Sequence, residues 1–390
     1  MSKEKEKENP QEPLQDFFSQ MVSQTSSMLS PMDPLGAMKP LQQIAEAWTK
    51  NPQQFADAMQ TWTEQIGDMN TRIWQEFLDS QNEDSPEGKQ PTDLADLPYF
   101  TWIREYFRTY SSWMEQQIHE TSGVSEKVKE DASFWSKQML SALSPKNYFW
   151  TNPEAINAFI ESKGESLHKG LQNWLKDQQR DGMPEMVDKT QFQVGGNLAN
   201  TPGKIIYRNE LIELIQYEPM TEEVHEIPIV ITPPWINKYY ILDLKPQKSF
   251  IRNLVSQGYT VFVISWKNPT REMRGTSMDD YLRLGPMKAI EAAKTIAKSK
   301  KVHAVGYCIG GTLLASAMAS LNHPDNPQGG AVKDWTLLTT LVEFERPGEL
   351  GSFINEESLE YLEDQMSKQG YLEGAQMGNT MRMLRADGLI

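Results

Sequence analysis

The single cysteine of the chain lies among glycines, in the sequence Gly306-Tyr307-Cys308-Ile309-Gly310-Gly311. The strand-like segment KVHAV precedes it, and the helix-forming segment TLLASAMASL follows it. This is the G-x-C-x-G form of a nucleophile elbow, a sharp strand-to-helix turn that exposes a reactive side chain above a sheet. The turn needs glycine because a Cβ would collide with the neighbouring strand or helix. We therefore predict that Cys308 is the catalytic nucleophile and that Gly306, Gly310 and Gly311 are the elbow glycines.

The alternative, without a catalytic role, is a small buried cysteine in a glycine-rich turn. The surrounding segments favour the functional reading. A helix N-terminus stabilises negative charge, and the N–H of Ile309 would point at a substrate oxygen as one oxyanion donor. The strand EIPIVIT ends in PPWIN, where an α/β-hydrolase places its second donor. Proline has no N–H, so we predict that this donor is Ile236.

A cysteine nucleophile of this kind needs a histidine base and an acid that orients it. His303 precedes Cys308 on the same strand by ~16 Å of extended chain, and His323 lies ~20 Å away, past the following helix. His225 precedes a strand and belongs at the opposite end of the sheet, while His119 and His168 fall in a helical region. None of them is predicted to reach the thiol.

Glu343 and Glu345 follow the last predicted strand and are the carboxylates available for the acid. Loop carboxylates are usually solvated surface residues, and no histidine is available for them to orient. In the hydrolase order of nucleophile, acid and histidine, both partners follow later strands. We therefore expect both partners to be missing from this chain.

The elements around the elbow are strands and helices in alternation. Short runs rich in Val, Ile, Thr and aromatic residues predict strands at KIIYRNELIELIQY, EIPIVIT, YTVFVISW, KVHAVGY and DWTLLTTLV. Helices are predicted between them at 246–257, 278–298 and 311–321. This alternation indicates a mostly parallel sheet covered on both faces. The predicted fold class is α/β, an α/β-hydrolase fold that is incomplete because its C-terminal strands are missing.

The residues before 190 read as helices. Asn51-Pro52 and Asn152-Pro153 are helix-start signals, and apolar residues recur at steps of three and four after each of them, as they do after Tyr99 and along 125–143. Such stripes usually face a core, but they could also dock a partner or an apolar polymer surface. We predict a disordered tail over 1–14, an all-helical N-terminal domain over 15–190 and a partial α/β-hydrolase catalytic domain over 191–390.

Composition limits the partners of the chain. A net charge of -15 over 390 residues argues against nucleic-acid binding, which needs a basic surface. No segment is apolar enough to be a transmembrane helix, and the charged start MSKEKEKENPQEP is unlike a signal peptide. One cysteine rules out a disulfide framework and a cysteine-rich metal site. We expect a cytoplasmic protein that holds no metal and no cofactor.

Several segments together resemble the polyhydroxyalkanoate synthases, which polymerise 3-hydroxyacyl-CoA into storage polyester. The matching segments are SPKNYFWTNPEAI, GGNLANTPGKIIYRNELIELIQYEP, TPPWINKYYILDLKPQKSF, GYTVFVISWKNP, GYCIGG and LTTLVEFERPGELG. The resemblance implies that Cys308 carries the growing chain as a thioester and that CoA, the thioester component of the substrate, is released. It also makes Asp243 and Arg385 candidates for substrate binding.

The position of Cys308 and the form of PPWINKYYILDL resemble the single-subunit class I enzymes that use short substrates such as 3-hydroxybutyryl-CoA. The resemblance implies a granule-associated enzyme, a homodimer when complete, whose N-terminal helices could bind granule-associated proteins. Family members continue beyond MLRADGLI with the catalytic aspartate and histidine, so we expect a C-terminally truncated, inactive fragment. The alternatives are a cysteine-variant α/β-hydrolase or depolymerase, and a non-catalytic protein that binds granules or partners.

Overall fold

The computed structural model describes residues 33–80, 93–179, 188–326, 329–374 and 378. The predicted tail over 1–14 and the candidate Arg385 lie outside these residues. The chain divides into two compact units, which are described separately. The first comprises residues 1–184, 347–364 and 378–390, and the second comprises 185–346 and 365–377.

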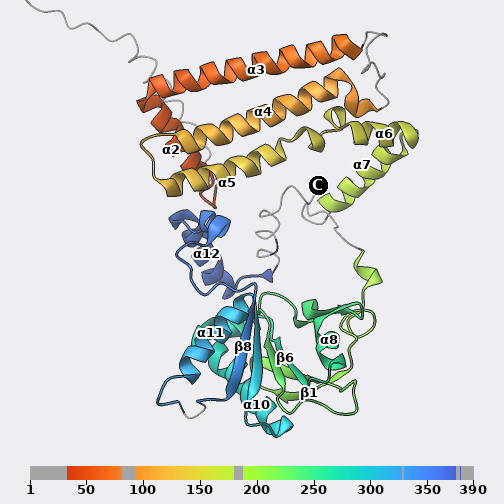
Figure 1. Ribbon diagram of the computed structural model, residues 1–390, viewed down its shortest axis with the longest axis vertical. Helices are drawn as coiled ribbons and strands as arrows, with labels where there is room; N and C mark the ends of the chain where they lie inside the picture. Colours follow the sequence, from red (N-terminus) through yellow and green to blue (C-terminus); the bar gives the residue numbers. More distant parts are fainter. Residues whose placement is uncertain (1–32, 81–92, 180–187, 327–328, 375–377, 379–390) are drawn as a thin grey trace, which may run out of the picture. The chain divides into compact units, whose positions relative to one another are not determined.

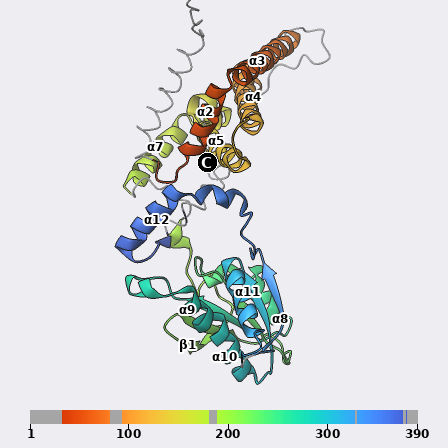
Figure 2. The same ribbon diagram turned by 90° about the vertical axis from the view of Figure 1, so that its left-hand side faces the viewer.

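Helices make up the first unit, and Figures 1 and 2 show α2, α3, α4 and α5 gathered side by side. Their bounds are α2 Met38–Lys50, α3 Pro52–Ser80, α4 Pro98–Glu120, α5 Glu126–Ala142, α6 Pro153–Glu161 and α7 Glu165–Gln178, with short turns η2 Leu94–Asp96, η3 Pro145–Asn147 and η4 Phe149–Thr151. The turn η9, Gly348–Phe353, also belongs here, and its Phe353 ring lies 5.4 Å from Phe134 and 5.3 Å from Trp135. Helix α12, Glu356–Gln369, continues from it.

The stripe predicted after Asn152 is divided between two helices. Lys163 and Gly164 both adopt positive φ, at 51° and 93°, and the Gly164 N–H donates to the Phe159 carbonyl at 2.8 Å. This is the left-handed ending that glycine allows at a helix C-terminus. The chain therefore turns between α6 and α7, where the apolar spacing alone predicted one continuous helix.

The second unit is built on a six-stranded mixed sheet with the order β1-β2-β6-β3-β7-β8. Strands β6, β3, β7 and β8 are parallel, whereas β1 and β2 form an antiparallel edge. This agrees with the predicted, mostly parallel sheet and is compatible with an α/β-hydrolase-like architecture. The bounds are β1 Gly203–Arg208, β2 Ile212–Tyr217, β3 Ile229–Thr232, β6 Val261–Trp266, β7 Val302–Tyr307 and β8 Val332–Leu338, beside a small hairpin of β4 Asp243–Lys245 and β5 Lys248–Ser249.

Consecutive strand residues point to opposite faces of this sheet, and both faces carry apolar side chains. Helices therefore cover both faces. Val230 and Phe262 belong to one buried cluster, which is completed by α10, Lys288–Ala297, and α11, Ile309–Leu321. Ile231 and Val263 belong to the other, which is completed by α8, Phe250–Ser256. The remaining elements are η5 Lys189–Gln191, η6 Tyr239–Leu242, η7 Arg271–Gly275, α9 Met278–Leu282 and the π-turn η8 Arg283–Met287. The segment predicted as a helix over 278–298 is thus interrupted by a π-turn.

Candidate active site

Cys308 lies between the last residue of β7 and the first residue of α11. Its backbone has φ 54° and ψ -131°, a conformation that L-residues rarely adopt. Such strain persists only where surrounding structure holds it, and it occurs frequently at active sites. Cys308 as a whole residue is half-buried.

The neighbouring glycines have close backbone contacts that leave no room for a side chain. A Cβ on Gly306 would clash with the Cα of Gly311, and a Cβ on Gly311 would clash with the side chain of Thr340. A Cβ on Gly310 would collide with the Thr232 carbonyl oxygen and would lie 2.5 Å from that of Pro233. Strand β7, helix α11 and the segment after β3 therefore meet at closer range than side chains permit.

Hydrogen bonds fix the backbone of Cys308 on both sides. Its N–H donates to the Leu338 carbonyl at 2.9 Å, and its carbonyl accepts from Gly311 N at 2.8 Å and from Thr340 Oγ1 at 3.3 Å. The end of β8 and the residues after it thus brace the turn. This bracing offsets the local strain and keeps the thiol in one place.

The segment after β3 carries the predicted second donor. Pro233 and Pro234 are buried, and Ile236 emerges from the surface with 41% of its area exposed. Both Ile236 and Ile309 line one cavity of about 870 Å³ within the second unit. The two predicted oxyanion donors therefore share a cavity, although they lie more than 70 positions apart in the chain.

That cavity combines cationic, amide and apolar side chains. Lys238 and Arg274 supply positive charge, and Lys238 Nζ donates to Asn268 Oδ1 at 2.8 Å. The aromatic residues Trp235 and Tyr281 contribute ring surface, and burial raises the pKa of the Tyr281 hydroxyl, so this group stays neutral. The cavity can therefore accept a ligand that has both an anionic part and an apolar part.

A capping box positions Tyr281 on α9. Ser277 Oγ accepts from the N–H of Asp280 at 3.3 Å, and the Asp280 carboxylate accepts from the N–H of Ser277 at 2.9 Å. This reciprocal pairing satisfies free N–H groups at the start of the helix. The hydrogen bond from Ser277 lowers the pKa of the Asp280 carboxyl. Sequence reasoning did not single out Tyr281, although the S-x-x-D pattern before it was visible.

The histidines of this unit lie away from Cys308 in contacts of their own. His303 is on β7 and its Nδ1 is 2.7 Å from Asp334 Oδ1 on β8. The ring of His225 packs 4.4 Å from that of Tyr259, at the end of the sheet where the parallel strands begin. Among the residues that the structure describes, no hydrogen bond to the Cys308 sulfur is found.

Asp243 is buried, with 1% of its area exposed, and its carboxylate is fully engaged. Oδ1 accepts from the hydroxyls of Thr201 and Ser249, both at 2.6 Å, and Oδ2 accepts from the N–H of Thr201 at 3.3 Å. The side chain does not line the cavity. These hydrogen bonds give Asp243 structural contacts with Thr201 and Ser249. Its contact with substrate stays a prediction.

Glu343 and Glu345 lie on the exposed segment after β8. The backbone N–H of Glu345 donates to the carboxylate of Glu343. Both are exposed loop residues, as the sequence indicated.

Groups of three or more metal-ligating side chains are absent from the described residues. No described helix is long and apolar enough to cross a bilayer.

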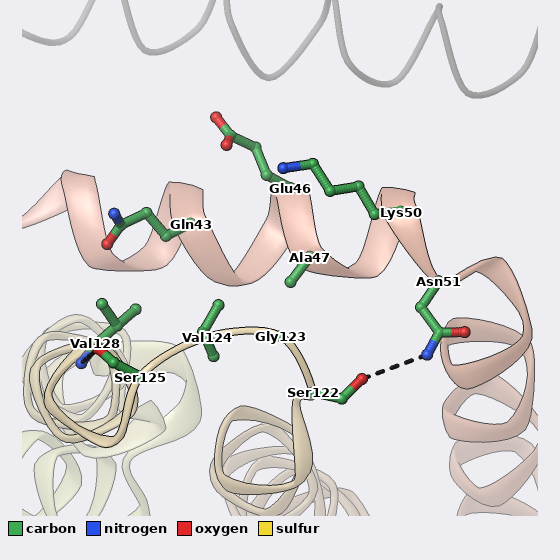
Figure 3. A pocket seen from close by; sticks show the side chains of 10 residues that line it. All are labelled: Gln43, Glu46, Ala47, Lys50, Asn51, Ser122, Gly123, Val124, Ser125 and Val128. Atoms are coloured by element: carbon green, nitrogen blue, oxygen red, sulfur yellow. Dashed lines mark hydrogen bonds between the residues drawn. The ribbon is translucent and has the colours of Figure 1, made fainter.

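The first unit contains a smaller cavity of about 460 Å³ between α2 and the turn that follows α4. Figure 3 shows Ala47 facing Val124 across it, and a hydrogen bond of 3.4 Å from Asn51 Nδ2 to Ser122 Oγ at one end. Its lining residues include no cysteine and no histidine. We assign no chemistry to it.

Comparison with known proteins identifies the relatives of the chain. Residues 90–254 match the family model described as "Poly-beta-hydroxybutyrate polymerase (PhaC) N-terminus". A poly(3-hydroxyalkanoate) polymerase of Methylorubrum extorquens is 38% identical over 363 residues, which are 90% of this chain and 59% of that protein. Polymerase subunits of Rhizobium etli and Cupriavidus necator are 38% and 39% identical, over 94% and 68% of this chain and 59% and 45% of theirs.

A solved sugar hydrolase of Lactococcus lactis covers 41% of this chain and 63% of its own at 15% identity, with a TM-score of 0.27 that is too low to bear on the fold. The sequence relatives are far closer. The chain spans about three fifths of the length of the Methylorubrum and Rhizobium proteins. By sequence, this chain is similar to poly(3-hydroxyalkanoate) polymerases over 90% and 94% of its length in the Methylorubrum and Rhizobium comparisons.

Proposed function

We propose that this chain, within a protein of the length of its relatives that is called the full-length protein below, polymerises 3-hydroxyacyl-CoA into polyester through an acyl thioester on Cys308. The observation that carries the proposal is the strained backbone of Cys308, held between β7 and α11 and braced by Thr340. A half-buried cysteine in such a turn is suited to attack on a carbonyl. The relatives named as poly(3-hydroxyalkanoate) polymerases supply the substrate class.

In the proposed acylation step, the Cys308 sulfur attacks the carbonyl carbon of the CoA thioester and forms a new C–S bond. The C–S bond to CoA breaks, and the proton of the Cys308 thiol passes through a general base to the leaving CoA sulfur. A thioester is exchanged for a thioester, so the step is close to neutral in free energy. Serine would instead form an oxygen ester, which is harder to pass on to the next hydroxyl group.

The N–H groups of Ile309 and Ile236 are the proposed donors to the oxyanion that develops during this attack. Both residues line the cavity that also contains Lys238 and Arg274. These cations suit the phosphates of CoA, and the aromatic walls suit an acyl chain. We propose a short acyl chain such as 3-hydroxybutyryl. The general base and the acid that orients it are not found among the described residues.

The first experiment separates polymerisation from hydrolysis. The full-length protein is incubated with 3-hydroxybutyryl-CoA, and released CoA, polymer and free acid are measured together. The proposal expects CoA release with polymer, and loss of both in Cys308→Ala. Release of free acid without polymer would instead favour the hydrolase or depolymerase alternative.

A second proposed role, attachment to the polyester surface, rests on α7. Four apolar side chains on this helix are each at least half exposed: Leu167, Leu171, Trp174 and Leu175. Exposed apolar stripes suit an apolar or amphipathic surface. We propose a cytoplasmic, granule-associated protein whose N-terminal helices, α7 among them, bind the granule surface or granule-associated proteins. We also propose that the complete protein is a dimer.

Sedimentation tests this second role. The full-length protein should co-sediment with isolated polyester granules, and a variant with Leu171 and Trp174 replaced by Ser should sediment several-fold less. Matched replacements of the exposed polar residues Gln172 and Lys176 on the same helix should change nothing. Equal sedimentation of all three proteins would remove α7 from granule attachment.

A further inference from the structure

The segment that carries the second proposed donor begins at a buried carbonyl that has one strong partner. The Pro233 carbonyl oxygen accepts from Nε1 of Trp266 at 2.7 Å. Strand β3 ends at Thr232, and Pro234 has no N–H, so the sheet ladder does not extend to this peptide. The indole N–H of Trp266 therefore supplies the hydrogen bond that the Pro233 carbonyl cannot receive from the sheet.

Trp266 can reach this carbonyl because it is the last residue of β6, the parallel neighbour of β3. The carboxyl ends of parallel neighbours lie at the same edge of a sheet. That edge is also where β7, on the other side of β3, leads into Cys308.

The same peptide also contacts the elbow. An alanine Cβ at position 310 would lie 2.5 Å from the Pro233 oxygen and 2.6 Å from its carbonyl carbon. The Pro233 peptide is therefore packed against the first turn of α11 while it is hydrogen-bonded to Trp266. A shift of this peptide would change the separation between Ile236, three residues later, and Ile309, which precedes Gly310.

The indole ring is itself held in place. A Cβ on Gly285 would collide with its six-membered ring, so the backbone of the π-turn η8 lies directly against the indole. The Tyr281 and Trp235 rings pack beside it, with centroids at 5.3 Å and 6.1 Å. These contacts leave the N–H little freedom to turn away from Pro233.

We propose that Trp266 is a positioning residue: its N–H fixes the Pro233 carbonyl and so holds the Ile236 donor in register with Ile309 across the oxyanion position. This inference deepens the proposed function and rests on it. The competing explanation is that the indole only fills space. Trp266→Phe separates the two, because phenylalanine keeps most of the ring packing and removes the N–H.

The test compares two reactions of the same thiol in the full-length protein. Acylation by 3-hydroxybutyryl-CoA passes through an oxyanion and uses both donors, whereas alkylation by iodoacetamide is a displacement that forms no oxyanion. Trp266→Phe should slow single-turnover acylation about tenfold, the usual order for loss of one hydrogen bond near 1.4 kcal/mol. Its alkylation rate should stay within twofold of the wild type. The matched control is Trp335→Phe, a half-exposed tryptophan on β8 that should leave both rates within twofold.

Equal acylation rates in wild type and Trp266→Phe would overturn the inference. So would a parallel fall in both reactions, or a Trp266→Phe protein that fails to fold, since either assigns the indole to packing alone. A wild-type protein whose Cys308 alkylates but takes up no acyl group would overturn the proposed function itself, and the inference with it. The two failures are therefore distinguishable from the wild-type measurement.

Discussion

Helices α11 and α7 have nearly the same length, at 13 and 14 residues, and both carry leucines at helical spacing, yet their environments are opposite. In α11, Leu313, Leu314 and Ala317 are at most 1% exposed. In α7 no residue is buried, and Leu171 is 54% exposed. Helix α11 packs against the sheet next to the turn at Cys308, whereas the apolar side chains of α7 are exposed.

The difference teaches that an apolar stripe does not by itself define a core. Helix α11 follows directly after Cys308, and a strained backbone persists only where the surrounding packing holds it. Helix α7 has no such constraint among the described residues. We therefore expect substitutions of the buried residues of α11 to lower the free energy of unfolding, and matched substitutions in α7 to change it little.

The largest expected difference is between two leucines. Leu314→Ala in α11 should lower the free energy of unfolding by about 3 kcal/mol, because it removes buried methyl groups and leaves a cavity. Leu171→Ala in α7 should change it by less than about 0.5 kcal/mol. Urea denaturation of the two variants checks this. Similar costs at both positions would show that α7 is buried against a partner.

Two glycine-to-alanine substitutions should change the free energy of unfolding by amounts that differ in sign as well as in size. Gly310→Ala forces a Cβ onto the carbonyls of Thr232 and Pro233 and should cost about 2 kcal/mol or more, with loss of acylation. Gly170→Ala, in the middle of α7, meets no atom within 4 Å and should stabilise by up to about 1 kcal/mol. Thermal unfolding measures both. A Gly310→Ala protein as stable as the wild type would contradict the close approach at the elbow.

Buried and exposed carboxylates extend the comparison. Asp243→Asn changes the acceptor of two buried hydroxyls and should cost about 1–2 kcal/mol, since hydrogen bonds to a charged group are the stronger ones. Asp57→Asn on the exposed side of α3 should cost less than about 0.5 kcal/mol. Unfolding in urea again gives the answer. If Asp243→Asn were neutral in stability but lost substrate affinity, the prediction that Asp243 binds substrate would be supported.

The smallest effect is expected at the exposed pair of Lys39 and Glu357 in the first unit, 2.6 Å apart. The hydrogen bond from Lys39 lowers the pKa of Glu357 below its ordinary value of 4.5. Its contribution is therefore present above that ordinary value and is lost as pH falls through the lowered pKa. Glu357→Gln should cost under about 1 kcal/mol at pH 7, because exposed pairs are weak. Stability curves against pH should converge for wild type and variant in acid; a constant difference would refute the ionic origin.

Much of this architecture was predictable, because the sheet is encoded by local pattern. The runs EIPIVIT, YTVFVISW and KVHAVGY became β3, β6 and β7, and the glycine spacing marked the turn at Cys308. The assignment of Ile309 and Ile236 as oxyanion donors stays a prediction. Periodicity also located α3, α4 and α5, but it misjudged their exposure: Phe55 and Tyr99, both on predicted stripes, are 41% and 54% exposed.

What sequence could not supply depends on contacts between distant segments. Trp266 meets Pro233 across 33 positions, and Gly285 meets Trp266 across the sheet edge, so no local pattern marks either contact. The YILDL motif drew attention to Asp243, but only its burial and its two hydroxyl partners separate a structural carboxylate from one that meets substrate. The break between α6 and α7 was marked only by Lys163-Gly164, which a regular apolar spacing obscured.

The most direct test of the central claim is peptide mass spectrometry of the full-length protein, quenched in acid within one turnover of 3-hydroxybutyryl-CoA. If the strained turn presents the nucleophile, the peptide containing Cys308 gains the mass of one 3-hydroxybutyryl group, and hydroxylamine removes it. The same adduct on another residue, or an adduct that persists in Cys308→Ala, would contradict the account.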